Sequence, residues 1–299
     1  MESTVMSKIP DIAEQLAWIA VDWGSSNLRA WGLDQHDQVI AQASSDKGML
    51  SLKADGYEAE LLRLVGDWLP ATGNTKVMVC GMAGARQGWQ EAAYLPVPTR
   101  LDQLSQGAVT PTLTSEQLDV YLLPGLSQTR SSATHFDVMR GEETQLAGLV
   151  ADAPAVSGLA CLPGTQSVLQ HSIGRDDLND AACRDAFVAA VKACVDAPAT
   201  YSSRLFGLRA QDLLDGQLAS GEKRRSLLAA RLSGLTIGLE LAGACSEQPN
   251  QAPITLIGNQ ALCQRYTLAL NAIGYQTHHV DGDTAVLSGL RLAHQALKA

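Results

Sequence analysis

Basic clusters are nearly absent from this sequence, which carries a formal net charge of -9 at pH 7. Its basic residues gather only in the short Glu-Lys-Arg-Arg stretch at 222–225, a pattern typical of a solvated helix face. Nucleic acids and long polyphosphates attract proteins through broad positive surfaces, which this composition does not supply. We therefore expect no nucleic-acid partner and no long polyanionic substrate.

Paired cysteines and long apolar runs are missing as well. Such scattered cysteines, without a Cys-x-x-Cys pair, are typical of small buried residues in a reducing compartment. Residues 1–23 lack the apolar core of a signal peptide, and no run approaches the roughly 20 apolar residues of a membrane span. The sequence therefore predicts a cytoplasmic protein without a membrane partner. The cysteines stand at positions 80, 161, 183, 194, 245 and 263.

Aromatic residues are few, whereas alanine, leucine and glycine are abundant, as in an ordinary globular protein. Short polar turns separate apolar strands at 17–22, 27–34 and 37–44, which predicts an antiparallel meander. Further strands are expected at 76–81, 118–125, 156–165, 254–258 and 275–280, and helices at about 56–69, 142–150, 177–196, 199–214, 222–245, 259–272 and 284–297.

The order of these elements occurs twice along the 299 residues, a length that suffices for two domains. A strand, a tight turn and then alternating helices and strands occur once before residue 152 and a second time after residue 153. Two related α/β domains, 1–152 and 153–299, with a cleft between them account for this order. The second half is short of about two strands after its Gly-Thr turn, if the halves share one pattern.

The stretch IAVDWGSSNLRAWGLD at 19–34 places Asp22 at a strand end, before a turn of small polar residues. Backbone N–H groups crowd together in such a turn and suit phosphate oxygens. Asp22 is suited to hold Mg²⁺ through water, because Mg²⁺ keeps several waters and takes one or two carboxylates. A type I′ hairpin explains the same residues without any ligand. Neither G-x-x-x-x-G-K-[ST] nor a G-x-G-x-x-G after a strand is present.

Two adjacent carboxylates, Glu142 and Glu143, begin one of the expected helices. On a helical wheel, Glu142 falls near the centre of the apolar sector formed by Leu146, Leu149 and Val150, and Glu143 lies nearer its edge. A carboxylate on the inward face is either ion-paired within the core or a functional base that faces a cleft.

Arg86 and Arg140 are candidates to bind a carboxylate, because guanidinium groups pair with carboxylates bidentately. Arg86 shares a glycine-punctuated loop with Trp89. A surface ion pair is the simpler explanation of each arginine. Gly258 and Asn259 follow a buried strand and open a helix, which suits either a nucleotide-binding turn or a plain helix N-cap.

Three segments, DWGSSNLRAW, LPGT and LIGNQALCQRY, have the order and spacing of the phosphate-one, phosphate-two and adenosine loops of the superfamily of sugar kinases, actin and heat-shock chaperones. Two further segments, CGMAGARQGWQEAAYLPVP and DVMRGEETQLAG, resemble the 2-dehydro-3-deoxygalactonokinase family, bacterial enzymes that phosphorylate a 3-deoxy-2-keto sugar acid. The resemblance covers nearly the whole chain. It implies two related actin/hexokinase-like (ribonuclease H-like) α/β domains around a central nucleotide cleft.

The resemblance also implies roles for individual residues, with ATP and Mg²⁺ as cofactors. Glu142 is the expected base for the proton of the sugar hydroxyl, and Asp22 is the rival base and the expected Mg²⁺ ligand. The remaining expected roles are binding of the ATP phosphates by Gly24, Ser25, Ser26, Asn27, Gly164 and Thr165, of adenosine by Gly258 and Asn259, and of the sugar acid by Arg86, Trp89, Arg140 and Glu143.

The implied reaction transfers phosphate from ATP to the terminal hydroxyl of 2-dehydro-3-deoxy-D-galactonate, giving the 6-phosphate in D-galactonate breakdown. The sugar acid is expected mainly on the first domain. Two alternatives are a phosphohydrolase of the exopolyphosphatase type and a non-catalytic nucleotide or sugar sensor of the same superfamily. A homodimer is the candidate assembly.

One departure from the family pattern follows the LPGT segment. The family continues with His-Ser-Lys-Trp, a strand pair and a Thr-Gly-Glu-Leu helix start, whereas this sequence reads LPGTQSVLQHS. Either that part of the pattern is deleted, or the sequence joins two segments across a hairpin that it omits. We favour the second, because a deletion would remove contacts to both the substrate and the phosphates. The lysine of that loop has no match here.

Overall fold

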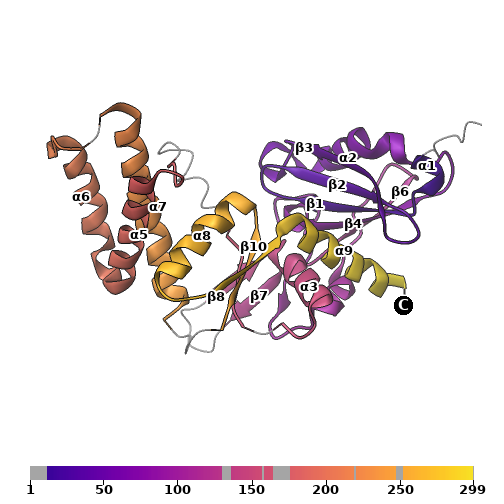
Figure 1. Cartoon of the computed structure of the whole chain (residues 1–299). Coiled ribbons are helices and arrows are strands. Elements are labelled where there is room, and N and C mark those ends of the chain that lie inside the picture. The colour runs from indigo at the N-terminus through magenta and orange to yellow at the C-terminus, as the bar shows by residue number, and fades with distance from the viewer. Residues whose placement is uncertain are drawn as a thin grey trace, which may run out of the picture. The chain divides into compact units, whose positions relative to one another are not determined.

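The computed structural model describes residues 12–129, 136–156, 158–163, 176–218, 220–246 and 252–298 (Figure 1). The chain divides into two compact units, the first comprising Met1–Val156 with Asp283–Ala299 and the second comprising Ser157–Gly282. This division differs from the expected boundary between residues 152 and 153, because the last helix belongs to the first unit. The expected mixed α/β class is confirmed.

A five-stranded sheet with the order β3-β2-β1-β4-β6 forms the centre of the first unit. The predicted meander is confirmed, because β1 pairs antiparallel with β2, and β2 pairs antiparallel with β3. β4 lies parallel to both β1 and β6. The strands are Trp18–Trp23 (β1), Leu28–Leu33 (β2), Val39–Ser45 (β3), Thr75–Gly81 (β4) and Leu118–Leu122 (β6).

Four helices and a small second sheet complete the first unit as far as the structure describes it. The helices are Ile12–Gln15 (α1), Tyr57–Val65 (α2), Glu142–Asp152 (α3) and Gly282–Lys298 (α9), and short 3-10 turns lie at Met49–Ser51, Ala54–Gly56, Gly66–Trp68, Met82–Gly84 and Leu101–Gly107. The second sheet consists of Leu95–Pro96 (β5), Leu126–Thr129 (β7) and Phe136–Met139 (β8). The sequence did not predict this sheet, because strands of two to four residues are too short to show clear alternation.

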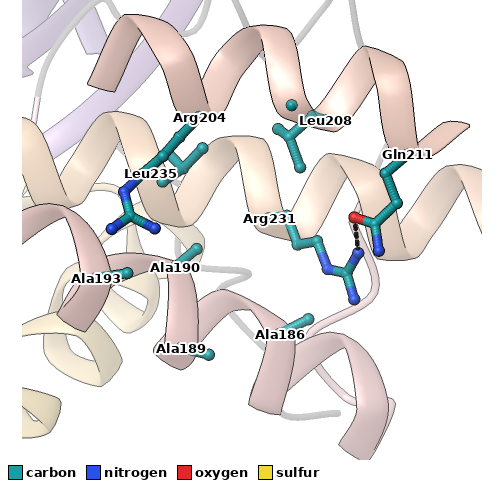
Figure 2. Close-up of a pocket in the computed structure, with 10 residues that line it drawn as sticks. Ala186, Ala189, Ala190, Ala193, Arg204, Leu208, Gln211, Arg231 and Leu235 are labelled. Atoms are coloured by element: carbon teal, nitrogen blue, oxygen red, sulfur yellow. Dashed lines mark hydrogen bonds between the residues drawn. The ribbon is translucent and has the colours of Figure 1, made fainter. Parts of the chain in front are cut away.

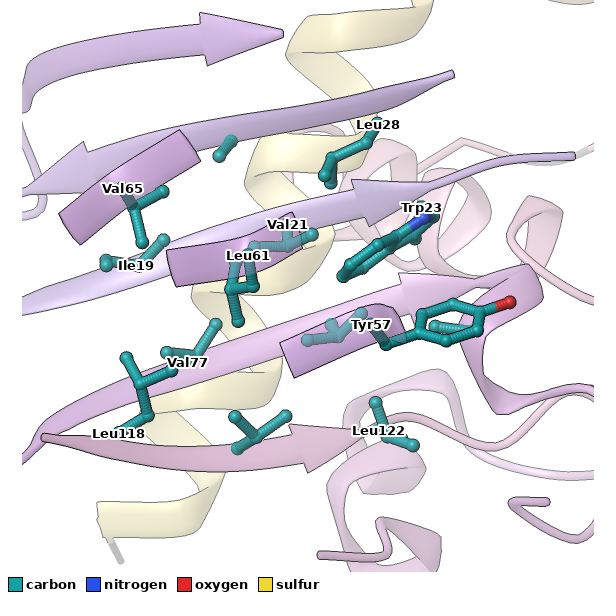
Figure 3. Packing of buried hydrophobic residues seen from close by; sticks show 14 of the residues in the cluster. Ile19, Val21, Trp23, Leu28, Tyr57, Leu61, Val65, Val77, Leu118 and Leu122 are labelled. Atoms are coloured by element: carbon teal, nitrogen blue, oxygen red, sulfur yellow. The ribbon is translucent and has the colours of Figure 1, made fainter. Parts of the chain in front are cut away.

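Side chains alternate across the strands of the large sheet, so each of its faces supports a separate core. On one face, Ile19, Val21 and Trp23 pack with Tyr57 and Leu61 of α2 (Figure 3). The opposite face packs against α9, in a cluster that includes Trp18, Ala20, Trp31, Met78, Cys80, Val286 and Leu290. The ends of β1 and β4 are therefore fixed from both sides.

The helices α3 and α9 approach each other through glycine. A Cβ atom on Gly148 of α3 would overlap the carbonyl oxygen of Ala285, and a Cβ on Gly289 of α9 would overlap that of Thr144. Only a residue without a side chain fits at such a distance, because protein interiors are packed without spare volume. Backbone contact, and not large apolar side chains, therefore defines this helix pair.

The described part of the second unit combines a three-stranded parallel sheet, of order β11-β10-β9, with four helices. The expected strand at 156–165 is observed only as the two residues of β9, and residues 164–175 lie outside the described part of the chain. The elements are Ala160–Cys161 (β9), Ile254–Gly258 (β10), Thr277–Asp281 (β11), Ala181–Asp196 (α5), Tyr201–Leu214 (α6), Gly221–Ala244 (α7) and Gln260–Ala272 (α8), with a 3-10 turn at Pro198–Thr200.

The helix α7 is the one described helix that is long and apolar enough, by length and composition, to cross a membrane. The sequence had suggested no such segment. Within the unit, α7 packs closely on α5, because a Cβ on Gly238 would lie 2.8 Å from the carbonyl oxygen of Val191. Core helices pass the same composition test, and the buried residues of α7 contribute to the core of this unit.

Candidate active site

Asp22 lies at the carboxyl end of β1, between two neighbouring strands. It stands opposite Arg29 of β2 and opposite Cys80 of β4 in the strand register. The Arg29 guanidinium forms ion pairs with both Asp22 and Asp283, which lies in the first turn of α9. The Cys80 thiol lies 3.8 Å from Oδ1 of Asp22. The protein therefore holds this carboxylate from two sides.

The turn that follows Asp22 spans four residues between the paired positions Trp23 and Leu28, so it is not the two-residue type I′ hairpin considered above. It is closed by a 2.8 Å hydrogen bond from the Gly24 amide to the Asn27 carbonyl. Amides of residues 48–50 donate to the carbonyls of Gly24, Ser25 and Ser26. The amides of Ser25, Ser26 and Asn27 donate to no carbonyl of the described chain, so they are available for phosphate oxygens.

Glu143 is fully buried, whereas Glu142 is exposed. The prediction that Glu142 lies on the inward face of its helix is therefore wrong. The helical wheel gave most weight to the large apolar residues, and Val150 among them is 42% exposed. Where α3 meets the α9 backbone, around Thr144 and Gly148, no large apolar side chain fits. The buried residues of α3 are Glu143, Thr144, Ala147, Gly148 and, as the one large apolar residue among them, Leu149.

Both carboxylates bind amides at the start of α3. The Gly141 amide donates to Oε2 of Glu143 at 2.7 Å, and the Arg140 amide donates to Oε2 of Glu142 at 3.0 Å. Burial raises the pKa of Glu143 to about 7, and the Glu142 charge adds to this shift, while the Gly141 amide opposes it. Glu143 is thus a carboxyl group that changes protonation near neutral pH.

The two carboxylates Asp22 and Glu143 share one neighbourhood, with Cys80 as the link. Burial raises the pKa of the Cys80 thiol well above its usual range, and the charges of Asp22 and Glu143 raise it further. The thiol is therefore protonated and can donate to Asp22. Glycine permits the close approach, since a Cβ on Gly81 (φ 87°) would lie 2.6 Å from the Trp23 carbonyl oxygen, and one on Gly141 (φ 108°) would lie 3.5 Å from Gly81 Cα.

Arg140 is buried, with 8% of its surface exposed. Its Nη2 donates to the Ala92 carbonyl at 2.7 Å, and its guanidinium lies 4.2 Å from the centre of the Tyr94 ring. Its Nε and Nη1 atoms are buried and have no hydrogen-bond partner among the residues that the structure describes. Gly84 leaves room for this group, because a Cβ there would lie 2.8 Å from Nη1. A buried cation with unmet donors is costly unless an anion pairs with it.

Arg86 has the opposite environment, with 81% of its side chain exposed and its Nε 3.5 Å from the Glu91 carboxylate. The simpler explanation considered above, a surface ion pair, is what the structure shows. Trp89 from the same loop turns inward and contacts the Trp23 and Tyr57 rings, at centroid distances of 6.0 and 5.8 Å. Arg86 therefore lies at the surface, whereas Trp89 packs against the core.

Gly258 and Asn259 lie in the second unit, at the end of β10 and the start of α8. Gly258 has φ 151°, and its carbonyl is 3.2 Å from Nε2 of His279. Asn259 caps α8, since its side-chain oxygen accepts from the Ala261 amide at 2.9 Å. Capping is therefore observed, and nucleotide binding by these residues stays a prediction. Gly164 and Thr165 lie outside the described residues.

The 2-keto-3-deoxy-galactonokinase family model matches the chain over residues 22–169 and 165–293. A protein of Rhizobium meliloti named a probable 2-dehydro-3-deoxygalactonokinase is 34% identical, with 94% of this chain and 97% of that protein covered. The 2-dehydro-3-deoxygalactonokinase of Escherichia coli is also 34% identical, over 93% of this chain and 97% of that enzyme. The chain belongs to this family.

Structural similarity agrees with this assignment. A crystal structure from Sinorhizobium meliloti attributed to the same kind of kinase has a TM-score of 0.80 and 33% identity, and covers 94% of this chain and 99% of that one. The resemblance inferred from the sequence motifs is thus confirmed, as is the class of enzyme, a 2-dehydro-3-deoxygalactonokinase. The two pieces of the family match meet at 165–169, where the sequence departs from the family pattern.

The sequence of this 2-keto-3-deoxy-galactonokinase family member did not identify Arg29, Cys80 or Asp283 as residues of the candidate site. Arg29 could have been found, because residues 22 and 29 face each other when four residues form the turn between their strands. Cys80 and Asp283 are brought to Asp22 by tertiary structure alone. No group of three or more metal-ligating side chains occurs within the described ranges.

Proposed function

We propose that this kinase transfers the γ-phosphate of ATP to the terminal hydroxyl of 2-dehydro-3-deoxy-D-galactonate, giving the 6-phosphate in D-galactonate breakdown. Family membership supports the class of reaction. The observation that carries the acid specificity is Arg140, a buried guanidinium with two unmet donors three residues from Glu143 in the chain. A sugar acid supplies the carboxylate that such a group lacks.

Access to Arg140 depends on Tyr94. The unmet Nε and Nη1 atoms have almost no solvent-exposed area, and the Tyr94 ring lies against the guanidinium. Tyr94 as a residue is 37% exposed, so we infer that its ring covers the arginine from the solvent side. We infer that the Tyr94 side chain moves when the substrate carboxylate binds, and that the carboxylate replaces the ring as the partner of Arg140.

The phosphates of ATP are proposed to bind the turn Gly24–Asn27, with adenosine at Gly258 and Asn259. Mg²⁺ fits the donor chemistry at Asp22, because this ion takes one or two carboxylates and otherwise retains water and phosphate ligands. The metal ion would neutralise charge on the transferring phosphoryl group. Arg29 and Cys80 orient the Asp22 carboxylate toward that task.

Glu142 is the proposed base. Its carboxylate is exposed and accepts the Arg140 amide, so it is accessible to a sugar hydroxyl whose acid group binds Arg140. Glu143 is sealed from solvent and holds the Gly141 amide, which suits a residue that fixes the start of α3 close to the substrate. Asp22 stays the rival base.

A transfer assay tests the proposal. The full-length protein would be incubated with ATP, Mg²⁺ and a panel of 3-deoxy-2-keto sugar acids, and the product followed by ³¹P NMR. A new phosphate monoester at the terminal carbon is expected. ATP hydrolysis without transfer would favour the phosphohydrolase alternative, and nucleotide binding without turnover would favour a sensor. We further infer a cytoplasmic homodimer without nucleic-acid or membrane partners. The net charge of -9 supports the absence of a nucleic-acid partner.

A further inference from the structure

The second unit contains an open pocket of about 310 Å³ between three consecutive helices, and none of the residues assigned above lines this cavity (Figure 2). Each helix lines it with one face. The lining residues are Ala186, Ala189, Ala190 and Ala193 of α5, Arg204, Gly207, Leu208 and Gln211 of α6, and Arg231 and Leu235 of α7. The α5 positions follow the i, i+3, i+4, i+7 spacing at which a packed helix normally carries large apolar residues. Alanine at all four leaves the space between the helices open, and Ala189 itself is exposed to solvent.

Two guanidinium groups enter this cavity, and neither has a carboxylate partner among the described residues. Arg204 donates from Nε to the Thr200 hydroxyl at 2.7 Å. Arg231 donates to the side-chain oxygen of Gln211, as Figure 2 shows. Gln211 in turn donates to Asp215 at 3.2 Å, a bond that lowers the Asp215 pKa, with a smaller contribution from the Arg231 charge. The cavity is therefore positive within an acidic protein.

The helix directions place the two arginines at opposite ends of the alanine surface. The chain turns back between α5 and α6, so Arg204 lies near Ala193, and the Gln211–Arg231 pair lies near Ala186 (Figure 2). Seven residues at 1.5 Å each separate Ala186 from Ala193, so the arginines are offset by about 10 Å along α5. A ligand that meets both must carry its acidic groups at its two ends.

We propose that this cavity binds a small organic dianion, a chain of about six carbons with an acidic group at each end. An extended chain advances about 1.2 Å per bond, so such a molecule spans about 8 Å and brings each acid within reach of one guanidinium. Its carbon chain lies on the alanine surface. Carboxylate and phosphate monoester ends satisfy this chemistry equally.

The product of the reaction proposed above is one such molecule, with a carboxylate at one end and a phosphate at the other. This identification rests on the proposed function, whereas the chemistry of the cavity does not. Bound product would link α5, α6 and α7, and the cavity is then a second site at which the product acts on its own kinase.

Isothermal titration of the full-length protein with 6-phosphogluconate and adipate tests the site, with inorganic phosphate and malonate as short anions. Both long anions are expected to bind the wild type at least about tenfold more tightly than malonate, because only they reach both arginines. Adipate matches malonate in charge, so that pair separates the effect of length from the effect of charge. Ala189→Leu places a larger side chain on the α5 lining and narrows the cavity, and Arg204→Met and Arg231→Met each remove a charge. Each variant should weaken binding at least about tenfold.

Matched controls come from the same helices. Ala182→Leu on α5 and Arg209→Met on α6 change exposed residues that do not line the cavity, and both should bind like the wild type. Melting curves establish that every variant is folded. Equal affinity for long and short anions, or binding that survives Ala189→Leu and Arg231→Met, would overturn the proposal.

The kinase site provides the remaining comparison. Binding that persists in Arg140→Ala and is lost in Ala189→Leu supports a separate site. Binding lost only in Arg140→Ala would place the dianion in the active site, which overturns this proposal and leaves the proposed function standing. If the transfer assay fails while the cavity variants still abolish binding, the proposed function is contradicted and the dianion site is supported.

Discussion

Arg29 lies directly opposite Asp22 in the antiparallel pair of β1 and β2, and the two side chains form an ion pair. The same guanidinium pairs with Asp283, so one cation serves two carboxylates. With 15% of its side chain exposed, Asp22 keeps a route to solvent while its orientation is fixed. This arrangement makes Asp22 the most constrained carboxylate at the end of the sheet, and a sensitive position for mutation.

Asp22→Asn should lower kcat by on the order of a hundredfold or more, the range expected when a positioned charge contact to the transition state is lost. The fold should persist, because Arg29 retains Asp283 as a partner. Steady-state kinetics and circular dichroism provide the two measurements. Asp55→Asn, at an exposed position of a 3-10 turn, is the matched control. A wild-type kcat in Asp22→Asn would exclude the proposed role of Asp22 in holding Mg²⁺.

Arg140→Ala should raise KM for the sugar acid tenfold or more and leave KM for ATP nearly unchanged. A charge-assisted pair contributes about 1.5–3 kcal/mol, which corresponds to that factor. Arg86→Ala is the control, because exposed pairs such as Arg86–Glu91 contribute little, and its KM should stay within about twofold. Equal effects of the two substitutions would contradict the assignment of the carboxylate to Arg140.

Glu142→Gln should reduce kcat by about 10²–10⁴-fold with little change in either KM, which is the usual contribution of a general base. Phosphoryl transfer draws most of its acceleration from positioning and charge, so residual activity is expected. The kinetic constants of Glu143→Gln, measured in parallel, distinguish the base from its neighbour. A larger loss in Glu143→Gln would exchange their roles, and no loss in either would favour Asp22.

Glu143 should make stability depend on pH. Its pKa is about 7 in the folded protein and near 4.5 in the unfolded chain, so the folded state holds the extra proton between these values. This contribution is complete below pH 4.5 and is lost as pH rises to about 7, a change of about 3 kcal/mol. The free energy of unfolding of Glu143→Gln, measured by urea titration, should not show the decrease between pH 4.5 and 7 that the wild type shows. Glu142→Gln should retain most of it, because burial is the main cause of the raised pKa and the Glu142 charge contributes a smaller part.

Gly148→Ala should lower the free energy of unfolding by about 1–3 kcal/mol or more, because the added methyl group forces α3 and α9 apart. Gly243→Ala near the end of α7 is the contrast, since nothing lies within 4 Å of the new Cβ. There, alanine should stabilise by about 0.5–1 kcal/mol through its helix propensity. Denaturant titrations of both variants compare the two. A neutral Gly148→Ala would show that the helix pair tolerates separation.

The sequence predicts the position and pairing of an element well where the residues of that element alone determine its apolar pattern. The meander of β1 to β3 follows from alternating apolar residues and polar turns, and its register places Arg29 against Asp22. The orientation of α3 does not follow in this way, because its inward face is determined by α9. That helix contacts Gly148 with backbone atoms, which leave no apolar signal in the sequence of α3.

The candidate site shows the same limit. Arg86 and Arg140 are equivalent as residue types, and only tertiary burial separates the exposed ion pair from the unmet guanidinium. Glu142 and Glu143 differ by one position, and the packing of α9 decides which of them is sealed. Motifs thus predicted the segments of the candidate site, whereas long-range packing decides which side chain of each segment faces the interior.

The helix α9 also constrains the order in which the protein can be built. It covers Trp18 and Trp31 on one face of the large sheet, yet it follows the whole second unit in the chain. During synthesis on the ribosome, domains usually fold from the N-terminus forward. Here the first strands to emerge must wait, with tryptophan uncovered, until a separate unit has been made. The N-terminal half therefore cannot complete its fold while it is being synthesised. Nascent chains halted before residue 283 should recruit chaperones at this exposed face.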